Sequence, residues 1–302
     1  MKHRPSTMWF EVMKQEKIFF YTIYGLKVQT NIHLPLLQLE CPSEDVDLNL
    51  YVNFSFFENS HLSVYEKENY YVVELYDYAN YYIFQDSNRI VCNAKNFESF
   101  FSTFFNIPFS IYLTLKQSAL IHACSLIYDG LYCFMGVKGI GKTTLTHLLS
   151  LGNNFKMFSD DTTRITNSCI GYAPHNLCKH TDENLSSLNI TNTCNRKNVT
   201  GKSYVCFDKT VEKEKVLAFI QLSRSQNQLP TIKKIKSLAL AKSIVYGNIT
   251  GISFYTKLLI NRVESLDFLS NIAVYKLSLP NDLTTLRQST KKIEELLFAL
   301  RL

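Results

Sequence analysis

The chain has 302 residues, of which 46% are hydrophobic and 19% are charged, a balance typical of a folded globular protein and unlike that of a disordered chain. This length allows two domains, or one large core with an appended lobe. The net charge of +6 comes from basic residues spread along the chain rather than gathered in a block, which argues against nucleic acid as a partner.

The first 96 residues are predicted to form a β-rich N-terminal lobe. Short runs rich in Tyr, Phe, Val and Ile are separated by Asn, Ser, Pro and Asp, a pattern typical of antiparallel strands. These runs are residues 17–30, 46–54, 69–86 and 89–94.

Residues 97–116 are predicted to form a helical linker, either one helix broken near Pro108 or two short helices. The run from Ser99 to Leu115 carries no charge, but it is short for a membrane span, and Asn106 and Pro108 interrupt it. We therefore expect buried helix here and no membrane span.

Residues 117–302 are predicted to form an α/β domain. It begins with a strand, a hairpin turn at Asp129-Gly130 and a second strand, followed by a helix from Thr143 to Leu151 that ends at Gly152. Further strands are expected at 156–159, 202–208, 216–224 and 273–279, and further helices at 237–246 and from 283 to the C-terminus.

Eight cysteines are present, none of them in a CxxC pair, and several lie in apolar strand-like runs where Cys acts as a small hydrophobe. The polar N-terminus shows no secretory hydrophobic segment. Both features favour a reducing, cytoplasmic location.

The sequence "GVKGIGKT", residues 136–143, satisfies the phosphate-loop pattern G-x-x-x-x-G-K-[ST]. Glycines let backbone N–H groups approach phosphate oxygens, the lysine reaches the outer phosphates, and the threonine hydroxyl joins the shell of Mg²⁺. A glycine-rich turn without a ligand is the alternative, but it does not explain a Lys and a Thr in register at a helix start. We expect ATP or GTP with Mg²⁺ here, held by Gly136, Val137, Lys138, Gly139, Ile140, Gly141, Lys142, Thr143 and Thr144.

Asp160 and Asp161 end a predicted apolar strand downstream of the loop. One carboxylate can hold Mg²⁺ and the other can accept the proton of an attacking hydroxyl, which are the two tasks that phosphoryl transfer leaves to the protein. Which residue performs which task stays open. The alternative is a helix N-cap beside a solvated aspartate.

Four further candidate residues stand on weaker patterns. His122 lies in the apolar run "LIHACS", where a single histidine is more often a core residue than a functional one. His175, Cys178 and His180 fit no common zinc spacing, so we expect a loop near the substrate there rather than a metal site.

The segment from Ser118 to Ile165 resembles the C-terminal domain of HPr kinase/phosphorylase and its stand-alone relatives. In that family an L-x-H-A-type strand, a hairpin, the phosphate loop and a strand ending in Asp-Asp follow one another at about this spacing. "YGLKVQTNIHLPLL" near the N-terminus is similar to the start of shorter HPr-kinase-related proteins of bacterial peptide-modification clusters, including those that phosphorylate lasso-peptide precursors. "APHNLCKHTDENLSSL" and "AVYKLSLPNDLTTL" resemble a loop and a terminal strand and helix of these relatives.

The resemblance implies a phosphoenolpyruvate-carboxykinase-like P-loop kinase core preceded by the β-rich N-terminal lobe. It implies that Lys142 and Thr143 bind phosphates and Mg²⁺, that Asp160 and Asp161 are the base and metal pair, and that His122 lies beside the transferred phosphoryl group. The R-G-L-G-I-I signature of true HPr kinases and its accompanying acidic residue are missing, which leaves phosphorylase activity and the HPr substrate open. Lys202 is either a basic group of this region or a solvated strand-edge lysine.

The expected function is an ATP-dependent kinase that phosphorylates a Ser or Thr hydroxyl of a peptide or small protein, such as a ribosomally made lasso-type precursor. A kinase of small metabolites and a non-catalytic nucleotide-binding regulator are the alternatives. The large first lobe argues against the former, and the paired aspartates argue against the latter, because sensing needs no general base. The oligomeric state, a homo-oligomer included, stays open.

Overall fold

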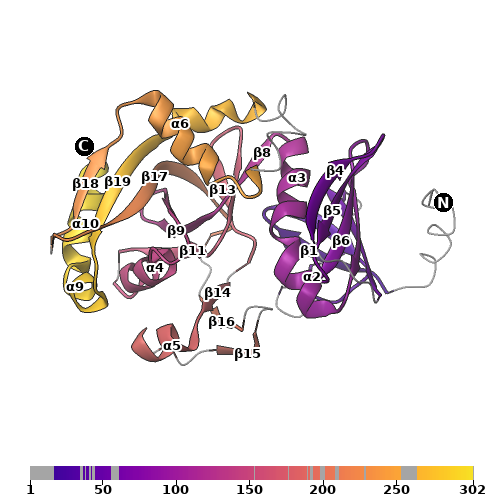
Figure 1. The fold of residues 1–302 in the computed structure, drawn as a ribbon, viewed down its shortest axis with the longest axis horizontal. Helices are drawn as coiled ribbons and strands as arrows, with labels where there is room; N and C mark the ends of the chain where they lie inside the picture. The colour runs from indigo at the N-terminus through magenta and orange to yellow at the C-terminus, as the bar shows by residue number, and fades with distance from the viewer. Residues whose placement is uncertain are drawn as a thin grey trace. The chain divides into compact units, whose positions relative to one another are not determined.

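The chain has a mixed α/β fold in the computed structural model, with three sheets among the described residues (Figure 1). It divides into two compact units, residues 1–100 and 101–302. The structure describes residues 17–34, 37, 39–40, 42, 45–55, 61–152, 154–175, 177–188, 190, 193–197, 201–207, 211–227, 229–252 and 264–301. The boundaries expected at 96/97 and 116/117 stay predictions.

The first unit contains a seven-stranded sheet in the order β1-β2-β3-β7-β6-β5-β4. Its strands are β1 (Phe19–Ile23), β2 (Leu26–Thr30), β3 (Leu48–Phe54), β4 (Leu62–Glu66), β5 (Tyr70–Leu75), β6 (Ala79–Phe84) and β7 (Arg89–Ala94). Side chains alternate between buried and half-buried along β6 and β7, as expected for a sheet with one face on the core. The β-rich character of this part is confirmed.

Two differences from the predicted strands appear in this sheet. The runs 17–30 and 69–86 each fold as a hairpin, β1–β2 and β5–β6, rather than as one strand. Strand β4 was not predicted. The pairs β2–β3 and β3–β7 are parallel, so the sheet is mixed rather than wholly antiparallel.

Residues 97–115 form two short helices, α2 (Phe97–Phe104) and α3 (Ile107–Leu115). The Asn96 side chain accepts a hydrogen bond from the backbone N–H of Ser99 in the first turn of α2. Pro108 lies in the first turn of α3, where its missing N–H costs nothing, so the break precedes the proline. No helix in the described ranges is both long and apolar enough to cross a membrane.

The second unit is organised around a nine-stranded sheet with the path β11-β9-β10-β17-β13-β12-β8, extended by β19 and β18. The strands are β8 (Ser118–Ile121), β9 (Ala123–Ile127), β10 (Leu131–Met135), β11 (Lys156–Ser159), β12 (Thr163–Thr166), β13 (Ile170–Tyr172), β17 (Lys213–Ser225), β18 (Thr231–Lys234) and β19 (Ala273–Pro280). Parallel pairing joins β10 to β17 and β17 to β19.

A smaller sheet and several helices complete this unit. The three-stranded sheet has the order β14 (Leu177–His180), β16 (Ser203–Cys206) and β15 (Thr193–Lys197). The helices are α4 (Lys142–Ser150), α5 (Asp182–Leu188), α6 (Leu238–Gly247), η2 (Glu264–Asn271), α9 (Leu283–Gln288), α10 (Thr290–Phe298) and η3 (Ala299–Arg301). The predicted helices at 143–151 and 237–246 are confirmed to within one residue at each end, whereas the C-terminal helix is divided at Ser289.

The strand expected before the Asp129-Gly130 turn is two strands, β8 and β9, which meet at His122. They pair with different neighbours: β8 with β12, and β9 with β10 and β11. The backbone N–H of His122 bonds to the carbonyl oxygen of Asn248 at 2.7 Å instead of to a strand partner. His122 therefore lies where the chain leaves one set of strands for another.

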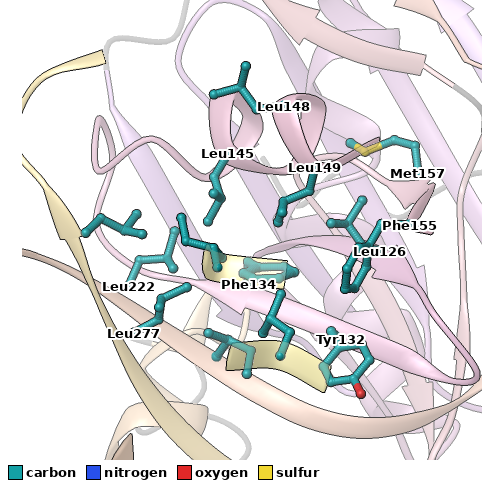
Figure 2. Close-up of a cluster of buried hydrophobic side chains, with 14 of the residues drawn as sticks. Leu126, Tyr132, Phe134, Leu145, Leu148, Leu149, Phe155, Met157, Leu222 and Leu277 are labelled. Carbon is teal, nitrogen blue, oxygen red and sulfur yellow. The ribbon is translucent and has the colours of Figure 1, made fainter. Parts of the chain in front are cut away.

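The helix after the glycine loop is anchored by its apolar face. Leu145, Leu148 and Leu149 of α4 are buried, at the i, i+3, i+4 spacing of one helix face, and they belong to one cluster with Phe134 of β10 and Leu222 of β17 (Figure 2). Each fully buried leucine contributes about 2 kcal/mol. This packing fixes the first turn of α4, and with it Lys142 and Thr143, against the end of β10.

Candidate active site

The glycine loop connects the end of β10 to the start of α4. Gly136, Gly139 and Gly141 have φ values of 147°, 84° and 102°, which residues with side chains rarely adopt. A Cβ on Gly141 would also lie 2.7 Å from Nη2 of Arg224. The outer turn, which includes Val137 at 71% exposure, faces solvent. The loop thus presents the N-terminus of α4, a site that favours anions, without side chains in the way.

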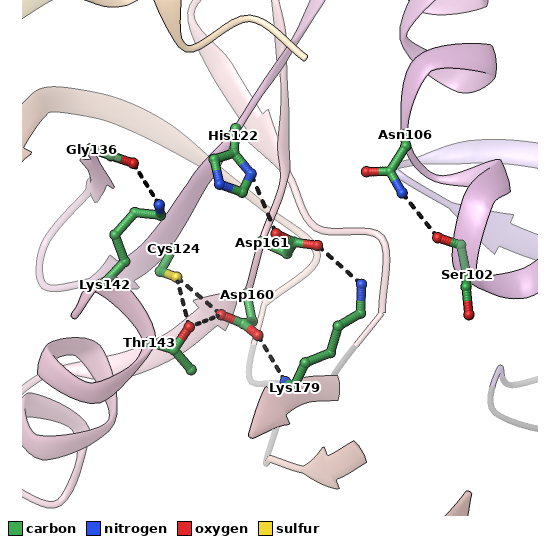
Figure 3. Close-up of polar contacts among 10 residues, drawn as sticks. All are labelled: Ser102, Asn106, His122, Cys124, Gly136, Lys142, Thr143, Asp160, Asp161 and Lys179. Carbon is green, nitrogen blue, oxygen red and sulfur yellow. Dashed lines mark hydrogen bonds and ion pairs between the residues drawn. The ribbon is translucent and has the colours of Figure 1, made fainter. Parts of the chain in front are cut away.

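Lys142 is buried, at 8% exposure, and its ammonium lies back over the loop (Figure 3). Nζ donates a hydrogen bond to the carbonyl oxygen of Gly136 at 2.6 Å. The lysine therefore holds its positive charge at the mouth of the loop, within reach of any anion bound there.

The carboxylate of Asp160 accepts a hydrogen bond from the first turn of α4. The Thr143 hydroxyl donates to Asp160 Oδ1 at 2.9 Å, and the backbone N–H of Lys179 donates to Asp160 Oδ2 at 2.8 Å. The Cys124 thiol donates to Oδ1 at 3.0 Å. Burial and the negative charge of Asp160 raise the pKa of Cys124, so the sulfur remains a protonated donor. Asp160 itself is 4% exposed.

Asp161 has a different set of partners. Its Oδ1 lies 3.3 Å from Nδ1 of His122, and its Oδ2 lies 3.0 Å from Nζ of Lys179 (Figure 3). The residue adopts a φ of 70°, a left-handed conformation that Asp tolerates better than most residues. The two aspartates, adjacent in sequence, therefore serve two separate clusters.

The charges around Asp161 keep its carboxyl group ionised. Burial raises the pKa of Asp161, but the positive charge of Lys179, the neighbouring His122 and the hydrogen bond from Lys179 outweigh this effect and hold the pKa far below its usual 3.8. Lys202 acts in the same direction, which supports its interpretation as a basic group of this region. Burial lowers the pKa of His122 below 6.5 despite the neighbouring Asp161, so its imidazole is neutral at pH 7.

The predicted residues Lys142, Thr143, Asp160, Asp161 and His122 thus meet at one edge of the sheet, where β10 and β11 end and β9 begins. Three neighbours were missed. Cys124 could have been found, since it lies two residues after His122 on a strand. Lys179 and Arg224 come from strands distant in sequence and carry no local signal.

Residues 177–180, expected as a loop, form strand β14. The prediction is wrong because β16 and β14 pair, and the pairing brings Lys179 to both aspartates. His175 stacks on Phe101 with ring centroids 6.3 Å apart. Within the described ranges, no group of three His, Cys, Asp or Glu side chains is arranged to hold a metal ion.

His180 is fully buried, and neither ring nitrogen has a hydrogen-bond partner among the described residues. Burial lowers its pKa from 6.5 to about 4; Asp160 opposes this shift, and His147 and Lys202 favour it. Because the unfolded chain binds this proton more readily than the folded protein, stability is lost as the pH falls from 6.5 toward 4. We expect a loss of about 3 kcal/mol across this window.

Urea denaturation at pH 7.0, 5.5 and 4.5 measures this effect. A His180→Leu variant should show a smaller pH dependence than the wild-type protein in this window, the remainder coming from His122 and His147, whose pKa values burial also lowers. A variant of the exposed His33, His33→Leu, should retain the wild-type pH dependence. Equal pH dependence of His180→Leu and the wild-type protein would contradict the assignment.

Comparison with known proteins gives no family assignment. No family model matches the chain, and no curated protein matches it. Among solved structures, the HPr(Ser) kinase/phosphatase from Coxiella burnetii matches at 17% identity, over 60% of this chain and 90% of that one, with a TM-score of 0.33. At this level of similarity no family is shown, and the function proposed below is argued from the geometry of the site.

Proposed function

We propose that this protein is a kinase that transfers the γ-phosphoryl group of ATP or GTP to a hydroxyl group. The observation that carries the proposal is that the two aspartates beside the glycine loop have different partners. Asp160 accepts a hydrogen bond from the Thr143 hydroxyl, and Asp161 lies between His122 and Lys179. A protein that only binds a nucleotide needs the loop and the first carboxylate. The second cluster adds an acid–base pair, which transfer to an acceptor requires.

The donor set around Thr143 fits Mg²⁺. The Thr143 hydroxyl and the Asp160 carboxylate are hard oxygen ligands 2.9 Å apart, of the kind this ion prefers, whereas the Cys124 sulfur is not a magnesium ligand. Thr143 and Asp160 would hold the ion. When bound with the nucleotide, Mg²⁺ neutralises charge on the phosphate oxygens.

The remaining residues act on the phosphates and the acceptor. The loop N–H groups and Lys142 stabilise negative charge on the transferring group. The acceptor hydroxyl gives its proton to the Asp161–His122 pair, whose carboxylate is ionised and whose imidazole is neutral at pH 7. The acceptor oxygen bonds to the γ-phosphorus as the bond between the γ-phosphorus and the β,γ-bridging oxygen breaks, and the nucleoside diphosphate leaves.

We propose a Ser or Thr hydroxyl of a peptide or small protein as the acceptor, such as a ribosomally made lasso-type precursor. Two features support this choice: the resemblance of the sequence to kinases of peptide-modification clusters, and the seven-stranded sheet of the first unit. A small acceptor needs less recognition surface than such a sheet supplies. Its terminal strand β4 offers an edge to which an extended peptide can add as a further strand. The edge of the other terminal strand, β1, already pairs with Leu39 and Glu40.

On this proposal residues 117–302 are a phosphoenolpyruvate-carboxykinase-like P-loop kinase domain, residues 97–116 a linker, and residues 1–96 a peptide-binding lobe.

Formation of nucleoside diphosphate from ATP or GTP, measured with each class of acceptor, tests the proposed function. Stimulation by Ser- or Thr-containing peptides, lost when these residues are replaced by Ala, is the expected result. Stimulation by free serine or sugars alone would favour a metabolite kinase, and tight nucleotide binding without product a regulator.

A further inference from the structure

Arg224 lies beside the glycine loop, on the opposite side from the paired aspartates. Strands β10 and β17 are parallel neighbours, with Met135 opposite Gln221. The chain leaves the sheet after Met135 to form the glycine loop, whereas β17 continues to Ser225, paired with β19. Strand β9, which carries Cys124, flanks β10 on its other side, and β11 lies beyond β9. The residues after Gln221 therefore run along the side of the loop that faces away from Asp160 and Asp161.

The arginine is close to the N-terminus of α4. A Cβ on Gly141, the N-cap residue of that helix, would lie 2.7 Å from Nη2 of Arg224. One nitrogen of the guanidinium is fixed, because Nη1 donates to the carbonyl oxygen of Pro280 at the end of β19. The side chain is exposed, and burial of part of it lowers the pKa of Arg224 without threatening its charge. An oriented, accessible cation thus stands next to a phosphate-binding helix start.

A nucleotide bound by this loop has two ends. Its γ-phosphate must meet the acid–base pair, Asp161 and His122, on one side of β10. The nucleoside end must then extend away from that pair, and the β17 side, with Arg224, is the other flank of the loop. A guanidinium suits this end in two ways, since it can bond to the α-phosphate and stack on the base.

We infer that Arg224 binds the nucleoside end of the nucleotide and so distinguishes a nucleoside triphosphate from a bare polyphosphate. The inference rests on the proposed function, because it needs a triphosphate in the glycine loop. It assigns Arg224 to binding and not to transfer.

The test is isothermal titration of ATP and of inorganic tripolyphosphate into the wild-type protein and into Arg224→Gln, Arg224→Lys and Lys233→Gln. Lys233 is exposed on β18 and serves as the control for loss of a positive charge. We expect Arg224→Gln to weaken ATP binding on the order of 10-fold and tripolyphosphate binding much less. Arg224→Lys should also weaken ATP binding, because it keeps the charge and loses the planar group.

If Arg224→Gln weakens the binding of ATP and of tripolyphosphate by the same factor, or leaves the affinity for ATP unchanged, the inference is overturned. The kinase proposal is left intact by either result. Failure of the wild-type protein to bind ATP would overturn both. The thermal unfolding temperature of each variant shows whether weaker binding comes from a loss of folded protein. This check is needed because Arg224→Gln also removes the hydrogen bond to Pro280. If Arg224→Gln unfolds at a lower temperature than the wild-type protein, the more conservative substitution Arg224→Lys decides. An unchanged preference of this variant for ATP over tripolyphosphate contradicts the inference.

Discussion

Replacing Lys142 with methionine is expected to lower phosphoryl transfer by about 10³-fold, with little loss of folded protein. Methionine keeps the apolar stem of the side chain in its buried position. It removes the ammonium that now donates to Gly136 at the loop entrance and that would stabilise charge on the transferring phosphoryl group. The rate with saturating peptide and nucleotide measures the effect.

The matched control is Lys156→Met, which removes an exposed lysine at the far end of β11. It should change the rate by less than about 2-fold, because a solvated surface charge contributes little. A Lys142→Met protein with near wild-type transfer would show that the loop does not act on the phosphates.

Asp161→Asn is expected to lower the rate of transfer by about 10²- to 10⁴-fold while leaving nucleotide affinity in the presence of Mg²⁺ nearly unchanged. Asp160→Asn should instead weaken that affinity and raise the Mg²⁺ concentration needed for activity. The difference follows from the partners: Asp160 bonds to the Thr143 hydroxyl, and Asp161 pairs with His122. Rates and affinities of both variants, each against a Mg²⁺ series, separate the two roles. The exposed carboxyl of Asp86 supplies the control, Asp86→Asn.

Asp161→Asn should also destabilise the fold, by about 2 kcal/mol, because it leaves the mostly buried ammonium of Lys179 without its carboxylate. The double variant Asp161→Asn/Lys179→Met should recover part of this loss, since no unpaired charge remains. Urea unfolding of the two single variants and the double variant gives the coupling directly. Additive losses of stability would mean that Asp161 and Lys179 are not coupled.

A transfer rate lowered mainly by Asp160→Asn, with nucleotide affinity lowered mainly by Asp161→Asn, would mean that Asp160, and not Asp161, meets the acceptor.

The glycine loop and its flanking elements could be predicted because each carries a local signal. The apolar strand before the loop and the i, i+3, i+4 spacing of Leu145, Leu148 and Leu149 after it fix the strand, the turn and the helix. The aspartate pair at the end of the next apolar run follows from the same kind of pattern.

The roles of the two aspartates could not be predicted, because adjacent residues of one type differ only in the neighbours that tertiary structure gives them. Lys179 contacts both, yet it reaches them through β14, a strand of a separate sheet. The break at His122 was equally hidden, since β8 and β9 are both apolar and no glycine or proline separates them. Pairing with different neighbours, not local propensity, divides the strand.

The most direct measurement is the intact mass of candidate peptides after incubation with the protein and Mg-ATP or Mg-GTP, with Asp160→Asn/Asp161→Asn as the control. The account predicts a gain of about 80 Da per phosphoryl group on a Ser- or Thr-containing peptide, absent with the double variant. No gain on any peptide despite confirmed nucleotide binding, or an equal gain with the double variant, would contradict it.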